Sequence, residues 1–376
     1  IVNNSVIPIT RNVLFKFTEP SKGEIYQPFE VLPPATVSIA NNVTIFADGN
    51  PKKVPVKVKA GLAGVSGEVS IKIPEGWVVS PASEPFNISR KGEESTYWFT
   101  ISPPKNENVG LVVPQVTIKG QTIAKKLVEM DYGHIPKQSV LLPSDAKVVR
   151  LNLEKAGENI GYIAGAGDEV PESLRQIGYN VVLIDAETLD AQLLSRFDAV
   201  VLGIRAYNVV DALKFKQKLL LEYVNKGGNL IVQYNTAPRR GTLDVENLAP
   251  YQLQISSDRV TDENAEVSLL LQDHSLLNFP NKITQKDFNG WTQERGLYFP
   301  SKWGSEFTPI LSMGDNGETP KEGSLLVAPY GKGHYIYTGL SFFRQLPEGV
   351  PGAFKLFANM LSIGKSQVEV KENLKE

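Results

Sequence analysis

Residues 227–241 read GGNLIVQYNTAPRRG, a stretch in which an apolar run leads directly into a sharp turn. An apolar run of this kind is typical of a strand that is buried on both faces of a parallel sheet. A large group of α/β enzymes carries its nucleophile in the turn that follows such a strand. Here the turn holds Asn235 and Thr236, with neither cysteine nor serine. The stretch therefore predicts an α/β sheet whose nucleophile position has lost its chemistry.

The flanking sequence, from about residue 148 to 364, alternates between strand and helix patterns. Apolar strands read NIGYIAGAG (159–167), NVVLIDA (180–186) and FDAVVLGIRAYN (197–208), and the helices between them read VPESLRQIGY (170–179) and DALKFKQKLLLEYVNKGG (211–228). The second helix would bury one face, formed by Ala212, Phe215, Leu219, Leu220 and Tyr223. SLLVAPYGKGHYIYTGLSFF (324–343) predicts a hairpin, and PGAFKLFANMLSIG (351–364) predicts a closing helix. This alternation predicts a doubly wound parallel sheet.

Residues 36–135 have a different rhythm, in which apolar and polar residues alternate between turn signals. Examples are TVSIA (36–40), VPVKVKA (54–60), EVSIKIP (68–74) and STYWFTI (95–101). This period of two, without a helical pattern, predicts an all-β antiparallel sandwich, with Trp77 in its core. Residues 1–35 are expected to be an extended linker, and residues 365–376 form a charged tail.

The composition excludes several classes of function. The chain has 376 residues, of which 41% are hydrophobic, and its net charge of −2 gives no electrostatic reason to expect nucleic acid as a partner. No apolar run approaches the roughly 20 residues that cross a bilayer. The absence of cysteine excludes disulfides, thiolate metal sites and cysteine nucleophiles. Because the chain begins at Ile1, we expect it to be part of a longer protein.

Candidate binding residues follow the strands, because ligands of open parallel sheets bind at the carboxyl ends of their strands. We expect the turns at 165–168, 205–208 and 235–236 to share one polar pocket with the loop 287–298. The aromatic stretch 287–303, to which this loop belongs, could stack on a carbohydrate. Arg205 should then pair with Glu294 or Asp168. The ligand-binding candidates are Asp168, Arg205, Tyr207, Asn208, Asn235, Arg239, Trp291, Glu294 and Arg295.

Two other site types have weaker support from the sequence. GAGDEV (165–170) is a partial dinucleotide-binding motif with Asp185 20 residues after Gly165, but its third glycine is missing and Asp168 would repel a pyrophosphate. A tight turn is the alternative interpretation. The three histidines lack metal-ligand spacing, so no metal and no cofactor is expected. A hydrolase could instead use His334, Thr236 and Glu294, provided that these side chains converge.

Residues 148–364 resemble the class I glutamine amidotransferase-like domain that is attached to PIG-L (LmbE-like) deacetylases of Bacteroidetes. The resemblance is carried by GIRAYN (203–208), GGNLIVQYNT (227–236), DRVTDE (258–263), DFNGWTQERGLYF (287–299) and YGKGHYIYTGLSFFRQLPEGVPGAF (330–354). It implies a flavodoxin-like doubly wound sheet. Residues 36–135 are similar to the Ig-like β-sandwich modules that accompany glycosidases.

The chain departs from this family pattern at the residues that would carry activity. The amidotransferase cysteine is replaced at Asn235–Thr236, and the deacetylase zinc motif His-Pro-Asp-Asp-Glu does not occur. The resemblance thus implies an upstream deacetylase domain and, in this chain, a non-catalytic accessory region that binds or positions glycan. It also implies a periplasmic or secreted location. The alternatives left open are the hydrolase above and a rigid spacer or dimer module.

Overall fold

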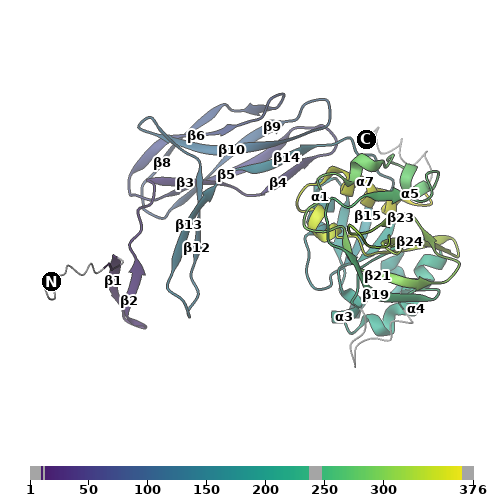
Figure 1. The fold of residues 1–376 in the computed structure, drawn as a ribbon. Helices are drawn as coiled ribbons and strands as arrows, with labels where there is room; N and C mark the ends of the chain where they lie inside the picture. Colours follow the sequence, from purple (N-terminus) through teal and green to yellow (C-terminus); the bar gives the residue numbers. More distant parts are fainter. Residues whose placement is uncertain (1–9, 12, 237–247, 366–376) are drawn as a thin grey trace. The chain divides into compact units, whose positions relative to one another are not determined.

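The computed structural model describes residues 10, 11, 13–236 and 248–365. Contacts divide the chain into two compact units (Figure 1). The first comprises the chain up to Asn42, Asn50–Lys105 and Val109–Val148. The second comprises Val43–Gly49, Asn106–Asn108 and the chain from Val149 onward.

The first unit is built from antiparallel strands, as its period of two predicts. One sheet has the order β3 (Ala35–Ile39), β5 (Lys52–Ala60), β9 (Glu94–Ser102), β7 (Val78–Ser80). The other sheet has the order β4 (Val43–Phe46), β14 (Ala146–Arg150), β10 (Asn108–Ile118), β6 (Val65–Lys72), β8 (Ser83–Ile88), with β11 (Gln121–Ile123) beside β10. Along β5 the valines are buried and the lysines are not, which is the alternation of a sheet with one solvated face. Trp77 is buried, and the prediction of a β-sandwich with this tryptophan in its core is confirmed.

Two hairpins accompany these sheets. β1 (Leu14–Glu19) pairs with β2 (Gly23–Pro28) inside the segment that was expected to be an extended linker. β12 (Lys125–Met130) pairs with β13 (Gln138–Pro143). Glu129 of β12 forms ion pairs with Lys137, which directly precedes β13, and with Lys59 of β5, each at 2.6 Å.

The second unit contains a seven-stranded sheet. Its order is β16 (Asn180–Leu183), β15 (Asn159–Ile163), β17 (Ala199–Leu202), β18 (Asn229–Gln233), β25 (Gly333–Thr338), β24 (Leu325–Tyr330), β22 (Thr308–Pro309). The pairs from β16 to β25 are parallel, whereas β24 and β22 are antiparallel to their neighbours. The predicted apolar strands and the predicted hairpin at 324–343 therefore belong to one sheet.

Helices cover both faces of this sheet. Alternate strand residues enter two separate cores: Val201 and Ile231 pack with α1 (Val170–Gln176) and α7 (Pro351–Ser362), whereas Val200 and Leu230 pack with α2 (Ala191–Leu194), α3 (Ala206–Val209) and α4 (Leu213–Asn225). One expectation for α4 was wrong, because Phe215 is 84% exposed. Ala212, Leu220 and Tyr223 of the predicted face are buried and Leu219 packs partly buried against the core, while Leu213 and Val224 take the place of Phe215.

Shorter elements lie between β18 and β25 in the sequence. β19 (Leu253–Val260) pairs with β21 (Gly296–Trp303), and β20 (Val267–Leu269) pairs with β23 (Leu311–Met313). The short helices α5 (Ser275–Asn278), η3 (Gln285–Phe288) and α6 (Phe342–Gln345) complete the unit. No helix in the described part of the chain is long and apolar enough to cross a membrane.

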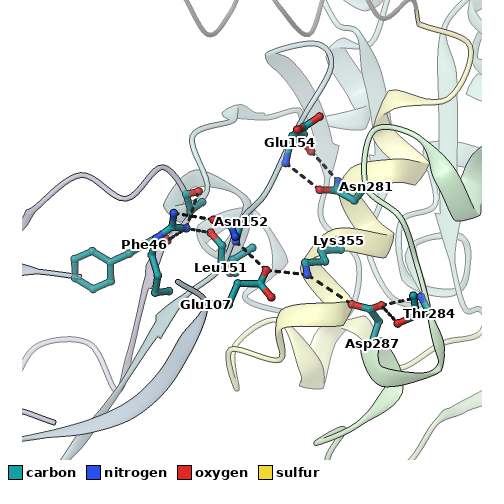
Figure 2. Close-up of polar contacts among 11 residues, drawn as sticks. Phe46, Glu107, Leu151, Asn152, Glu154, Asn281, Thr284, Asp287 and Lys355 are labelled. Atoms are coloured by element: carbon teal, nitrogen blue, oxygen red, sulfur yellow. Dashed lines mark hydrogen bonds and ion pairs between the residues drawn. The ribbon is translucent and has the colours of Figure 1, made fainter. Parts of the chain in front are cut away.

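A polar network holds α7 in the second unit (Figure 2). Lys355 of α7 forms an ion pair with Glu107 at 2.8 Å and lies 3.9 Å from Asp287. Glu107 also accepts a hydrogen bond from the backbone N–H of Asn152, and Asp287 accepts one from the backbone N–H of Thr284. The Lys355 ammonium is thus the shared partner of two carboxylates that organise separate loops.

Candidate functional site

The turn after β18, where the sequence pattern would place a nucleophile, holds an asparagine with a structural role. Asn235 is 1% exposed, and its side-chain carbonyl accepts a hydrogen bond from the backbone N–H of Tyr207 at 3.0 Å. Its amide donates to the Gln233 carbonyl, and its own N–H donates to the Tyr337 hydroxyl. Because both polar ends of its side chain are engaged, Asn235 ties the end of β18 to α3 and has no group left for a ligand.

The neighbouring residues of the two turns are also used to hold them together. Asn208 exchanges hydrogen bonds with the backbone of Thr236, accepting at 2.9 Å and donating at 3.4 Å. Tyr207 is buried, and its hydroxyl donates to Gln217. These residues therefore follow the strand ends as predicted, but their polar groups form hydrogen bonds within the protein. The residues are Tyr207, Asn208 and Thr236. Arg239 lies outside the described residues.

Asp168 has a structural role as well. Its carboxylate accepts hydrogen bonds from the Tyr162 hydroxyl at 2.6 Å and from the backbone N–H groups of Val170 and Ile204. It thus occupies the start of α1, where a dinucleotide would place its phosphates. A Cβ at Gly165 would lie 2.0 Å from the Ile204 carbonyl, so this glycine permits two turns to touch. These contacts favour the tight-turn interpretation of GAGDEV.

Trp291 and Arg295 belong to the core, which corrects their assignment as ligand-binding candidates. Trp291 is 4% exposed, packs against Phe342 and donates its indole N–H to the Asp287 carbonyl. Arg295 is 4% exposed and donates to the carbonyls of Ala265 and Phe288. Burial lowers the pKa of Arg295 to about 10. A ligand could reach neither side chain without displacing the surrounding packing.

The predicted pairing of Arg205 was also wrong. Glu294 forms its ion pair with Arg344, whose Nε lies 2.7 Å from the carboxylate, and Asp168 is satisfied by the groups described above. Arg205 is exposed, and within the described residues its side chain has no hydrogen-bond or ion-pair partner. Glu294 is available to Arg344 because buried Gln345 bonds both backbone groups of Thr292 and thereby fixes the loop.

An aromatic cluster lies beside these charges. The Tyr234 ring stacks on Tyr298, with centroids 5.6 Å apart, and lies 5.5 Å from Phe343. The Arg344 guanidinium lies over the Phe343 ring at 4.8 Å. Burial raises the pKa of Tyr234, while the charge of Arg205 opposes this shift and that of Glu294 adds to it. We call this group, formed by Tyr234, Tyr298, Phe343, Arg205, Glu294 and Arg344, the strand-end cluster.

Backbone strain is concentrated in the same place. Among the described residues, four that are not glycine have a positive φ, and Arg205 (57°), Gln293 (67°) and Tyr298 (54°) are three of them. Arg205 donates its N–H to the Tyr234 carbonyl, and Gln293 accepts a hydrogen bond from Arg344. Left-handed conformations cost L-residues about 1–2 kcal/mol each and cluster at functional sites. The strand-end cluster therefore has the character of a site.

Sequence reasoning named Arg205 and Glu294 and included Tyr298 in the aromatic stretch 287–303, but it missed Tyr234, Phe343 and Arg344 as members of the cluster. Tyr234 directly precedes the turn that was singled out, and its position after β18 could have identified it. Tyr298 and Phe343 come from segments whose approach depends on the packing of β21 and α6. No sequence pattern records that approach.

His334 excludes the alternative hydrolase site. It pairs in register with Asn229 at the start of β18, whereas Thr236 follows the end of that strand. Four strand steps of about 3.3 Å separate Asn229 from Gln233, so His334 and Thr236 lie at least about 13 Å apart. The His334 ring lies instead 3.4 Å from the Asn229 side chain. The proposed constellation of His334, Thr236 and Glu294 was wrong.

A cavity of about 280 Å³ lies elsewhere in the second unit, lined by residues of α2 and α4 and by Asp198 and Lys365. Asp198 pairs with Lys365 at 2.8 Å and accepts hydrogen bonds from the N–H groups of Glu158 and Asn159. Asp198 and Lys365, two of the charged residues that line this cavity, are therefore already paired with each other. No group of three or more potential metal ligands is found within residues 10–236 and 248–365.

No protein-family model matches this sequence, and no curated protein matches it. Among solved structures, the chain is similar to the exo-β-1,4-mannosidase Op5Man5 from Opitutaceae bacterium strain TAV5, with 14% identity and a TM-score of 0.31, over 55% of this chain and 35% of that one. It is also similar to a family 123 glycoside hydrolase from Clostridium perfringens, with 13% identity and a TM-score of 0.21, over 54% of this chain and 38% of that one. The chain thus spans well under half the length of either enzyme. At these TM-scores the likenesses carry no argument about fold or function.

Proposed function

We propose that this chain is a non-catalytic accessory region that binds glycan at the strand-end cluster. The observation that carries the proposal is the exposed Arg205, whose side chain has no partner among the described residues and whose backbone is held in a strained conformation next to Tyr234. Tyr234 itself is buried, and the partly exposed rings of Tyr298 and Phe343 pack against it. Aromatic rings offer apolar surface to the C–H groups of a sugar. Arginine offers donors in a fixed fork to its hydroxyl, carboxylate or acetamido oxygens.

The absence of catalysis is supported by the chemistry of the turn. Asn235 is not a nucleophile, and Thr236 has no histidine within reach, because His334 lies near the opposite end of β18. A plain hydroxyl is a weak nucleophile without an adjacent base. The residues that remain at the strand ends can orient a ligand but cannot activate an attacking group.

The family proposal rests on sequence motifs and on topology together. The parallel strand order β16-β15-β17-β18-β25 supports a flavodoxin-like sheet, which is the fold that the class I glutamine amidotransferase-like resemblance implies. The first unit would then be the Ig-like module. We propose that the chain belongs to a PIG-L-type, carbohydrate-directed deacetylase, with the deacetylase domain upstream and a periplasmic or secreted location.

Isothermal titration of the purified chain against N-acetylated oligosaccharides and polysaccharides, preceded by a glycan array, tests the binding. We expect a saturable response that Arg205→Ala abolishes and that Arg196→Ala, which truncates another exposed arginine, leaves intact. A flat response across the array refutes the proposal. Release of acetate or ammonia by the chain alone would refute its non-catalytic part.

A further inference from the structure

The first unit carries an exposed tryptophan on its four-stranded sheet. Trp98 of β9 is 57% exposed, whereas Phe99 and Ile101 on the same strand are buried. Trp98 lies in register with Pro55 of β5, the strand that pairs with β9, so the two share the outer face of the sheet. Val78 of the edge strand β7 is 60% exposed. Large aromatic side chains are among the most strongly buried on average, so Trp98 is an unusual residue to leave in solvent.

The residues around Trp98 are cationic and hydroxylic. Lys53 and Lys57 lie two residues on either side of Pro55, and they pair in register with Thr100 and Thr96. Both lysines are exposed, and within the described residues neither has a hydrogen-bond or ion-pair partner. Their Cα atoms are four strand steps apart, which is about 13 Å. Along the strand direction Trp98 thus lies between Lys53 and Lys57, whose ammonium groups have no partner among the described residues.

The acidic side chains near this face do not neutralise the two lysines. Glu94 pairs in register with Lys59, in the next same-face pair after Lys57 and Thr96, but within the described residues it forms no ion pair with Lys57. Glu129 bonds Lys59 and Lys137. The surface around Trp98 therefore keeps a positive charge, which selects for an anionic occupant.

We propose that this face, formed by Trp98, Pro55, Lys53, Lys57, Thr96 and Thr100, binds an acidic polysaccharide that carries carboxylate groups. The indole ring would contact the apolar face of one sugar, while the lysines bind carboxylates on the sugars before and after it. The threonine hydroxyls can bond sugar hydroxyls on the same side. This site lies in a different unit from the strand-end cluster and does not depend on it.

Binding of the full chain to polygalacturonate, measured by titration and compared with neutral dextran and with vesicles of anionic phospholipid, tests the proposal. Trp98→Ala and the double variant Lys53→Gln/Lys57→Gln should each weaken polygalacturonate binding at least about tenfold, which is about 1.4 kcal/mol. Matched controls are Phe215→Ala, another exposed aromatic, and Lys72→Gln/Lys125→Gln, two exposed lysines elsewhere in the first unit. All these side chains are exposed, so thermal unfolding should be unchanged and should verify that each variant is folded.

We also expect binding to weaken as ionic strength rises from about 0.1 M to about 1 M, over which the screening length falls from about 10 Å to about 3 Å. Arg205→Ala should leave polygalacturonate binding intact. Failure of the Trp98 proposal can therefore be distinguished from failure of the strand-end proposal. The inference is overturned if polygalacturonate does not bind, or if dextran binds equally well. It is likewise overturned if the control lysines matter as much, or if the Trp98-dependent partner is the vesicle.

Discussion

Replacing Arg205 by glycine should stabilise the protein, because Arg205 is a non-glycine residue in the left-handed region. Its φ and ψ are 57° and 21°. The contacts that hold it there are made by its backbone: its N–H donates to the Tyr234 carbonyl at 2.8 Å, and its own carbonyl accepts from the N–H of Asn208 at 2.8 Å. These contacts survive any substitution of the side chain.

The expected gain is about 1 kcal/mol. An L-residue pays about 1–2 kcal/mol for this conformation, whereas glycine pays almost none. Glycine loses about 0.5–1 kcal/mol more backbone entropy on folding, which offsets part of the relief. The exposed side chain has no partner to lose within the described residues, so Arg205→Ala should stay within about 0.5 kcal/mol of the wild type.

Urea denaturation of the wild type, Arg205→Ala and Arg205→Gly, followed by circular dichroism, measures this ranking. Glycan titration of the same three proteins completes the test. The glycine variant should be the most stable of the three, and both variants should lose glycan binding. A glycine variant that is less stable than the alanine variant would refute the strain argument. Retained binding in both would show that the strain serves no ligand.

Three further outcomes are expected. Arg295→Ala should cost about 3–5 kcal/mol in urea denaturation, because it leaves buried carbonyls without their donor and opens a cavity beside Trp291; a cost under 1 kcal/mol would refute the core assignment. Lys355→Met should lower the free energy of unfolding by about 1–3 kcal/mol, because it removes the partner of Glu107. A double-mutant cycle with Glu107→Gln should show coupling between the two residues, and additive effects would contradict the network. Hydrogen bonds from Lys137 and Lys59 lower the pKa of Glu129 to about 2, so its stabilisation is complete above pH 4.5 and is lost as the pH falls towards 2. The gap between wild type and Glu129→Gln, no more than about 1 kcal/mol for this partly exposed group, should close over that range, and a gap that is unchanged at pH 3 would contradict the pairing.

Much of the architecture could be predicted because burial repeats with a period that the sequence records. The valines of β5 alternate with lysines, and the residues of β17 and β18 form continuous apolar runs, so the sandwich strands and the parallel strands were both identifiable. The prediction failed where one apolar residue had two possible environments. Phe215 fits a helical stripe with Leu219 and Tyr223, which do pack against the core, yet Leu213 and Val224 complete the buried face of α4 and Phe215 faces solvent.

The site was harder to predict than the fold, because the type of a polar residue does not determine its partner. Arg205 and Arg295 both appeared suited to bind an anion. Arg295 donates hydrogen bonds to two backbone carbonyls in the core, whereas the side chain of Arg205 has no partner among the described residues. The carboxylate of Glu294, which was expected to pair with Arg205, instead pairs with Arg344. Arg344 lies 50 residues from Glu294 in the sequence. Such partners are chosen by tertiary packing, which periodicity cannot reveal.

The strand ends also explain how a sheet of this kind keeps its shape without a reactive residue in its sharpest turn. A cysteine or serine at position 235 would offer one small polar group, whereas Asn235 both accepts from α3 and donates to β18. Asn208 and Asp168 join the adjacent turns in the same way. The polar side chains of these strand-end turns are therefore used to hold the turns to one another. The side chain of Arg205 is exposed and takes no part in holding the turns. Tyr298 and Phe343, which later segments bring to the same edge of the sheet, add partly exposed aromatic surface for a ligand.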